Sequence, residues 1–170
     1  RFGGQMVAIT GSNGKTIVKE WAARSIPDTV RSFASPKSYN SQLGVALSLL
    51  MLSGEEQVAF IEAGISELGE MERLERMIAP DIVVFTSIGD AHSVNFQSEE
   101  HKIAEKLILA RRARTIIYSS EYPSLSGAIL RSYGDRRLVD SCREAVDDML
   151  ELSDALMVDA GHVSALMREL

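Results

Sequence analysis

The chain has 170 residues, of which 45% are hydrophobic, and this is enough apolar material for one packed core. We therefore expect a single domain over residues 1–170. The formal net charge of −6 excludes a generally basic surface for nucleic acid, so any bound anion must be held by a local device. The longest strongly apolar run, residues 45–52, is far shorter than the roughly 20 residues of a membrane-spanning helix, and we expect no membrane partner.

Two features of the chain indicate its setting. The single Cys142 cannot form a disulfide within the chain, which favours a reducing, cytoplasmic environment. The first residue is Arg1 rather than Met, and residues 2–4 have neither the basic start nor the apolar core of a signal peptide. We therefore expect the chain to be a fragment of a larger enzyme.

Short apolar runs alternate with longer amphipathic segments along the first two thirds of the chain. The predicted strands are residues 6–10, 58–61, 82–86 and 115–118. The predicted helices are residues 15–24, 42–52, 68–78 and a helix to about residue 110 that Ser98 caps. This alternation predicts an α/β fold with a mostly parallel sheet flanked by helices.

The pattern weakens after residue 118. Residues 119–127 are rich in serine, proline and glycine and are predicted to form turns, and Gly134 marks another break. Helical patterns return at residues 141–152 and 162–170. We interpret His101 and His162 as surface residues.

The most informative segment joins the first predicted strand to the first predicted helix. It has the form GxxGKT, with Ile9 where the longer phosphate-loop pattern GxxxxGK[ST] requires its first glycine. Glycines let backbone N–H groups approach a phosphate, the helix N-terminus favours an anion, and lysine adds a cation. The predicted nucleotide-binding residues are Gly11, Ser12, Asn13, Gly14, Lys15 and Thr16.

Polar side chains also follow two neighbouring predicted strands. Glu62 ends the strand at residues 58–61, and the strand at 82–86 runs on to Asp90 and His92. Alone, Glu62 could be a surface acid, Asp90 could order its own turn, and His92 is typical of a hydrogen-bonded loop histidine. Because the carboxyl ends of parallel strands share one edge of a sheet, we expect Glu62 and His92 to face the phosphate loop as metal ligands.

Several motifs together resemble the central ATP-binding domain of the Mur ligases, which are ATP-dependent enzymes of peptidoglycan precursor synthesis. The resemblance covers residues 6–118 and is weak over 119–170. Within the family the chain is most similar to the ligase type that adds D-alanyl-D-alanine to UDP-muramoyl tripeptide, in the form fused to alanine racemase in Bacteroidetes. The matching segments are residues 8–16, 38–45, 60–64, 68–72 and 87–92, with Phe96 and Lys106.

The resemblance implies a P-loop NTPase-like, three-layer architecture and a role for each matching residue. Lys15 would hold the β- and γ-phosphates of ATP, and Thr16 and Glu62 would bind one Mg²⁺. His92 would contribute to a second metal position. Asn40 matches an asparagine near the γ-phosphate and substrate, although Ser41 departs from the usual neighbour.

Lys106 falls where the family carries a lysine that CO₂ can carbamylate, which would give a carboxylate-like metal ligand. On the sequence alone, a solvated helix lysine beside Glu105 explains Lys106 as well.

The implied reaction is amide-bond formation through an acyl phosphate, with ATP and a UDP-muramoyl peptide as substrates. The intact enzyme would also have an N-terminal and a C-terminal ligase domain. Because these are absent from residues 1–170, we expect the chain alone to bind Mg·ATP weakly or not at all and to have no ligase activity.

Three other functions stay open on the sequence. Another Mur ligase or a folylpolyglutamate synthetase-like ligase would carry similar motifs, because specificity depends mostly on other domains. A P-loop nucleotide switch or NTPase would use the same loop but leaves Asn40, Glu62 and His92 unexplained. A structural module that has lost catalysis would hold no ion at the loop.

Overall fold

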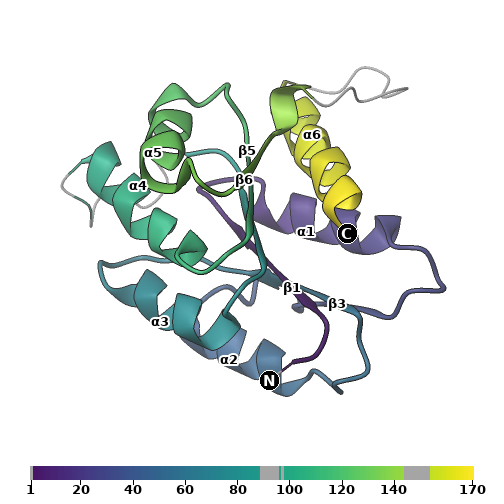
Figure 1. Cartoon of the computed structure of the whole chain (residues 1–170). Helices are drawn as coiled ribbons and strands as arrows, with labels where there is room; N and C mark the ends of the chain where they lie inside the picture. Colours follow the sequence, from purple (N-terminus) through teal and green to yellow (C-terminus); the bar gives the residue numbers. More distant parts are fainter. Residues whose placement is uncertain (1, 89–95, 97, 144–153) are drawn as a thin grey trace.

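Six parallel strands form one sheet in the computed structural model, which describes residues 2–88, 96, 98–143 and 154–170 (Figure 1). The strand order is β2-β3-β1-β4-β5-β6, so β1 lies between β3 and β4. The strands are β1 (Gln5–Thr10), β2 (Ser32–Ala34), β3 (Val58–Glu62), β4 (Ile82–Phe85), β5 (Thr115–Tyr118) and β6 (Arg137–Asp140).

Helices cover both faces of the sheet and give the expected three layers (Figure 1). One face packs against α1 and α6, and the other against α2, α3, α4 and α5. The helices are α1 (Lys15–Ser25), α2 (Gln42–Leu50), α3 (Glu70–Ile78), α4 (Glu99–Leu107), α5 (Pro123–Tyr133) and α6 (Asp154–Glu169), with the short helices η2 (Ile108–Ala110) and η3 (Ser141–Arg143).

Strand β1 is buried on both faces, which explains its nearly continuous apolar sequence. Val7 and Ile9 face the core under α1 and α6, whereas Ala8 faces the core on the opposite side. In the parallel register Ile9 pairs with Glu62 on β3 and with Val84 on β4. The three strand ends therefore bring the phosphate loop, Glu62 and the segment after β4 to one edge of the sheet.

The four predicted strands are confirmed, but two further strands were not predicted. β2 and β6 are the edge strands of the sheet and have only three and four residues. Neither shows a fully buried pattern, because an edge strand has a neighbour on one side only. Their pairing with β3 and β5, rather than their own sequence, defines them.

The prediction of turns over residues 119–127 was wrong in its second half. Helix α5 begins at Pro123, which occupies the first turn. Proline is tolerated there because the first N–H groups of a helix have no intrahelical acceptor. The predicted break at Gly134 is confirmed, since α5 ends at Tyr133.

The C-terminal prediction was partly wrong. Helix α6 extends over Asp154–Glu169 rather than residues 162–170 alone. Of the predicted helix at 141–152, residues 141–143 form the short helix η3, and residues 144–152 lie outside the described residues. His162 lies on α6 and is fully buried, so it is not a surface residue, whereas His101 is exposed. No helix within the described parts of the chain is long and apolar enough to cross a bilayer.

Candidate nucleotide and metal site

The segment 11–14 forms a loop between β1 and α1, anchored on the segment after β4. The N–H of Ser12 donates to the carbonyl oxygen of Ser87 at 2.6 Å, and Thr86 Oγ1 donates to the carbonyl oxygen of Asn13 at 2.6 Å. The N–H of Asn13 also donates to Ser87 Oγ at 3.2 Å. These bonds fix the loop at the carboxyl end of β1, as the sequence predicts for a phosphate-binding loop.

Both glycines of the loop are required by its geometry. Gly11 has φ +150° and Gly14 has φ +79°. A Cβ on Gly11 would lie 1.9 Å from Thr86 Oγ1, and one on Gly14 would lie 2.3 Å from an Asp159 carboxylate oxygen. No larger residue fits either position without rearrangement.

The N-terminus of α1 has the hydrogen-bonding capacity that an anion needs. Its first intrahelical bond runs from the N–H of Val18 to Gly14, so the N–H groups of residues 15–17 have no intrahelical acceptor. No side chain of the described residues caps this helix. By contrast, Ser41 caps α2, which was not predicted, and Ser98 caps α4, as predicted. An anion such as a phosphate satisfies these donors and the helix dipole.

Two lysines interact with the carbonyl oxygens of the same loop. Lys15 Nζ donates to Gly11 and Ser12, at 3.2 and 3.0 Å, and Lys106 Nζ on α4 donates to Gly11 at 3.0 Å. Burial lowers the pKa of Lys15, with Glu62 opposing and Lys102 adding to this effect. Burial, followed by repulsion from Lys15 and Lys102, lowers the pKa of Lys106 to about 7.

A small cavity of about 150 Å³ lies between these groups. Its lining includes three lysines, Lys15, Lys102 and Lys106. Asn40 and Glu70 also line it. The surplus of positive charge makes this cavity suited to an anion.

The predicted metal ligands Thr16 and Glu62 lie side by side. Thr16 Oγ1 donates to Glu62 Oε2 at 2.8 Å, and Asn40 Nδ2 donates to Glu62 Oε1 at 2.8 Å. Glu62 is only 1% exposed, so these two hydrogen bonds, rather than water, solvate its carboxylate group. The structure therefore brings together Lys15, Thr16, Asn40, Glu62 and Lys106 as the motifs predicted.

His92 and Asp90 lie outside the described residues, so the predicted second metal position is not located. Among the described residues, no group of three or more His, Cys, Asp or Glu side chains gathers around one point. A cation at Thr16 and Glu62 would therefore need further oxygen ligands from water or from a bound phosphate.

Two lysines at this site were not predicted from the sequence. Lys19 lies four residues after Lys15 on α1, and Lys102 lies four residues before Lys106 on α4. Both are buried. Residues four apart share one face of a helix, and this spacing is the sequence signal that could have located them.

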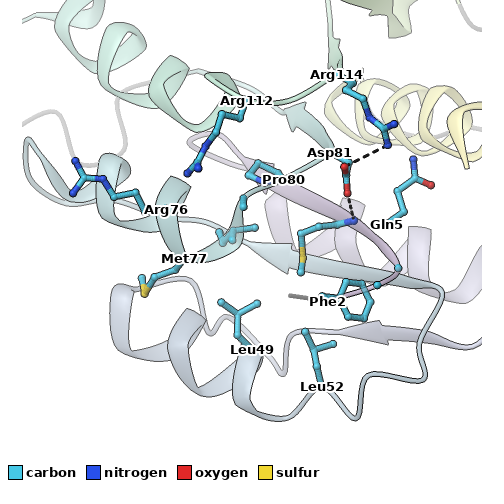
Figure 2. A pocket seen from close by; sticks show the side chains of 15 residues that line it. Phe2, Gln5, Leu49, Leu52, Arg76, Met77, Pro80, Asp81, Arg112 and Arg114 are labelled. Atoms are coloured by element: carbon cyan, nitrogen blue, oxygen red, sulfur yellow. Dashed lines mark hydrogen bonds and ion pairs between the residues drawn. The ribbon is translucent and has the colours of Figure 1, made fainter.

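A groove of about 980 Å³ lies at the opposite, amino-terminal edge of the sheet (Figure 2). Part of its lining is apolar and consists of Phe2, Leu49, Leu52, Met77 and Pro80. Its arginines are paired with acids: Arg76 with Glu72, Arg112 with Glu75 and Arg114 with Asp81.

The sequence model of the Mur ligase middle domain family matches residues 9–128, which is well over half of the chain. The chain belongs to the Mur ligase family. The matched region contains the phosphate loop, Asn40, Glu62 and Lys106, so the site described above lies within it.

Two curated proteins similar to the chain are both named UDP-N-acetylmuramoyl-tripeptide--D-alanyl-D-alanine ligase. The protein of Borreliella burgdorferi is 37% identical over 100 residues, covering 59% of this chain and 22% of its own length. That of Bacillus subtilis is 30% identical over 130 residues, covering 75% of this chain and 28% of its own length. The chain thus spans about a quarter of these relatives.

Solved Mur ligase structures confirm the fold. MurF of Acinetobacter baumannii superimposes with a TM-score of 0.79 over 96% of this chain and 42% of its own, at 20% identity. MurF of Thermotoga maritima, solved in complex with ADP, gives a TM-score of 0.72 over 81% of this chain and 32% of its own, at 26% identity.

Proposed function

We propose that the chain is the ATP-binding catalytic domain of a ligase that adds D-alanyl-D-alanine to a UDP-muramoyl tripeptide. The observation that carries the proposal is the uncapped N-terminus of α1 beside the paired Thr16 and Glu62, in a chain whose curated relatives bear that ligase name. The ADP complex of the Thermotoga maritima relative supports ATP as the nucleotide.

The proposed reaction joins a carboxylate to an amine in two steps. The peptide carboxylate attacks the γ-phosphate of ATP and releases ADP, and the dipeptide amine then displaces phosphate from the resulting acyl phosphate. Both steps place negative charge on oxygen atoms, so catalysis depends on orientation and on positive charge near the phosphates.

The phosphate loop supplies that orientation and charge. The N–H groups at the start of α1 would hold the β-phosphate, and Lys15 would move from the carbonyl oxygens of Gly11 and Ser12 to phosphate oxygens. Asn40, whose amide reaches Glu62, would orient the γ-phosphate side of the site. Lys102 lines the adjoining cavity and would attract the peptide carboxylate.

The residues present fit Mg²⁺. The hydroxyl of Thr16 and the carboxylate of Glu62 are hard oxygen donors 2.8 Å apart, the ligand type that this ion prefers. Bound there, Mg²⁺ would neutralise charge between the phosphates. We propose His92 for a second metal position, as the family resemblance implies.

We further propose that Lys106 is carbamylated. Its pKa of about 7 leaves a large fraction of the amine neutral at neutral pH, and only the neutral amine attacks CO₂. The product anion would replace one of three neighbouring positive charges by a negative one. Carbon-13 NMR of protein equilibrated with labelled bicarbonate should show a carbamate signal that is absent in Lys106→Met, and an unmodified amine in active enzyme would refute the proposal.

Substrate specificity depends on parts that the relatives have beyond this chain. We propose flanking ligase domains for the UDP moiety and the dipeptide, a cytoplasmic location, and fusion to an alanine racemase. The similarity of residues 31–42 and 62–66 to the Bacteroidetes type supports the fusion. Determining the complete reading frame around residues 1–170 tests it.

The test of the proposed function is phosphate release from ATP by the enzyme that contains this chain. Release should require both UDP-muramoyl tripeptide and D-alanyl-D-alanine, because neither step is completed without its nucleophile. Release with ATP alone would indicate a simple NTPase, and dependence on another amino acid would indicate a different Mur ligase.

A further inference from the structure

Lys19 on α1 is a fully buried lysine to which the proposed function gives no role. Its side chain has 0% exposure, and it is among the largest fully buried side chains of the described structure. A buried ammonium group is costly unless acceptors and negative charge surround it. Its partners therefore indicate what the charge is for.

Those partners are backbone carbonyl oxygens and carboxylates. Lys19 Nζ donates to the carbonyl oxygen of Ser35 at 2.6 Å and to that of Lys37. It lies 3.2 Å from a carboxylate oxygen of Glu20 and 3.9 Å from Glu62 Oε2. Glu20 is 42% exposed and is screened by water, whereas Glu62 is buried, so Glu62 is the buried countercharge.

The carbonyl groups that Lys19 holds belong to the segment between β2 and α2, which carries Asn40. Lys37 has φ +47°, a left-handed conformation that a residue other than glycine rarely adopts. Ser35 contacts the metal site from the same segment, since its Oγ accepts the N–H of Glu62 at 3.2 Å.

We propose that Lys19 is a positioning residue for the metal and nucleotide site. It ties α1 to residues 35–40, which keeps the Asn40 amide on Glu62 Oε1, and its charge balances the Glu62 carboxylate beside Thr16. This inference rests on the proposed function, because Lys19 acts through Glu62 and Asn40 and touches no substrate.

A purely structural lysine and a positioning lysine predict different measurements. Loss of a structural lysine lowers the melting temperature and leaves ligand affinity of the folded protein unchanged. Loss of a positioning lysine weakens metal binding specifically. Nucleotide binding without metal should change little, because the partners of Lys19 Nζ are Glu20, Ser35, Lys37 and Glu62 rather than residues 11–14 of the loop.

The experiment uses the complete enzyme that contains this chain and compares wild type, Lys19→Met, Lys19→Arg and Arg24→Met, an exposed position on the same helix. Mn²⁺ binding in the presence of ADP is measured by electron paramagnetic resonance, and ADP binding in EDTA by calorimetry. Lys19→Met should weaken Mn²⁺ binding by roughly tenfold to 100-fold, as for other residues that support metal ligands. Lys19→Arg, which keeps the charge, should recover part of this loss, and Arg24→Met should behave as wild type.

Unchanged Mn²⁺ affinity in folded Lys19→Met would overturn the proposal, even if the melting temperature falls. Should that variant not fold, hydrogen exchange of the wild type gives the answer. Mn²⁺ and ADP together should protect the amides of Tyr39 and Asn40, and unaltered exchange there would overturn the role of Lys19. A wild type that binds ADP under neither condition contradicts the proposed function and removes the role of Lys19 with it.

Discussion

The two edges of the sheet differ in how their charges are balanced. At the amino-terminal edge a groove of about 980 Å³ is bordered by arginines that are exposed and individually paired with acids. At the carboxyl-terminal edge a far smaller cavity is lined by three lysines, and repulsion from two of them helps to lower the pKa of the third, Lys106.

This contrast shows that cavity volume alone is a poor guide to the site of function here. Burying lysines next to one another destabilises the folded protein unless an anion binds among them. The larger groove shows no such cost, because each of its arginines already has a partner. Substitutions at the two edges should therefore affect different properties.

The largest expected effect is at the carboxyl-terminal edge. Lys15→Ala or Glu62→Ala should reduce ligation by the enzyme that contains this chain roughly 1,000-fold or more, because each removes charge stabilisation in the transition state. Steady-state phosphate release measures this, with Leu52→Ala in the opposite groove as the control. Near-normal turnover of Lys15→Ala or Glu62→Ala would be incompatible with the proposed function.

The second effect concerns two groups on α6, Asp159 and His162, whose contributions to the free energy of unfolding depend on pH in opposite directions. Burial lowers the pKa of His162 to about 4 from 6.5, so the unfolded chain binds more protons and stability falls as the pH drops through this window. Burial raises the pKa of Asp159 to about 6 from 3.8, so its contribution rises as the pH drops from 6 to 3.8. The two opposite slopes largely cancel.

In Asp159→Asn, the pH dependence of the unfolding free energy that comes from His162 should become measurable. Between pH 7 and pH 4 this variant should lose about 3 kcal/mol of unfolding free energy, measured by urea denaturation. His162→Leu should instead become more stable as the pH falls. Parallel profiles for wild type and both variants would show that neither group titrates as the structure indicates.

The third prediction separates two arginines of the amino-terminal edge. Arg112 binds Glu75 through two hydrogen bonds of 2.5 and 2.8 Å, and Glu75 is only 2% exposed. Arg112→Ala should lower the unfolding free energy clearly, because it leaves a buried carboxylate unpaired. Arg114→Ala should cost under about 0.5 kcal/mol, since that ion pair is exposed. Both variants should bind ADP like wild type, and weakened binding would contradict the contrast between the edges.

The smallest predicted effect is a gain in stability. The pKa of Lys106 is lowered from 10.5 to about 7, so the unfolded chain binds more protons across that range and charging Lys106 destabilises the fold. Lys106→Met should raise unfolding free energy at pH 7 by about 1 kcal/mol, the loss of its bond to Gly11 offsetting part of the gain. The wild type should gain more stability between pH 7 and 9.5 than the variant, in which Lys15 still has a lowered pKa but Lys106 is gone. An unstable variant would mean that the bond to Gly11 outweighs the burial of charge.

The sequence predicted the interior of the fold better than its edges. Buried strands such as β1 have a period and composition of their own, whereas β2 and β6 are defined by the strands beside them. Likewise the residues of the phosphate loop form a recognisable motif, but Lys19 and Lys102 look like ordinary helix lysines until tertiary packing buries them. His162 was misassigned for the same reason, because residue type favours the surface and only the packing of α6 places it inside.

The central position of β1 also affects how the chain folds during synthesis. β1 is made before the other strands of this sheet, yet Val7 pairs with Ile82, which is added 75 residues later. At typical rates the ribosome needs roughly 4 to 15 s to reach that partner. Throughout this interval the apolar strand that leads into the phosphate loop lacks one of its neighbours, and nascent chains are therefore most vulnerable to aggregation through residues 6–10.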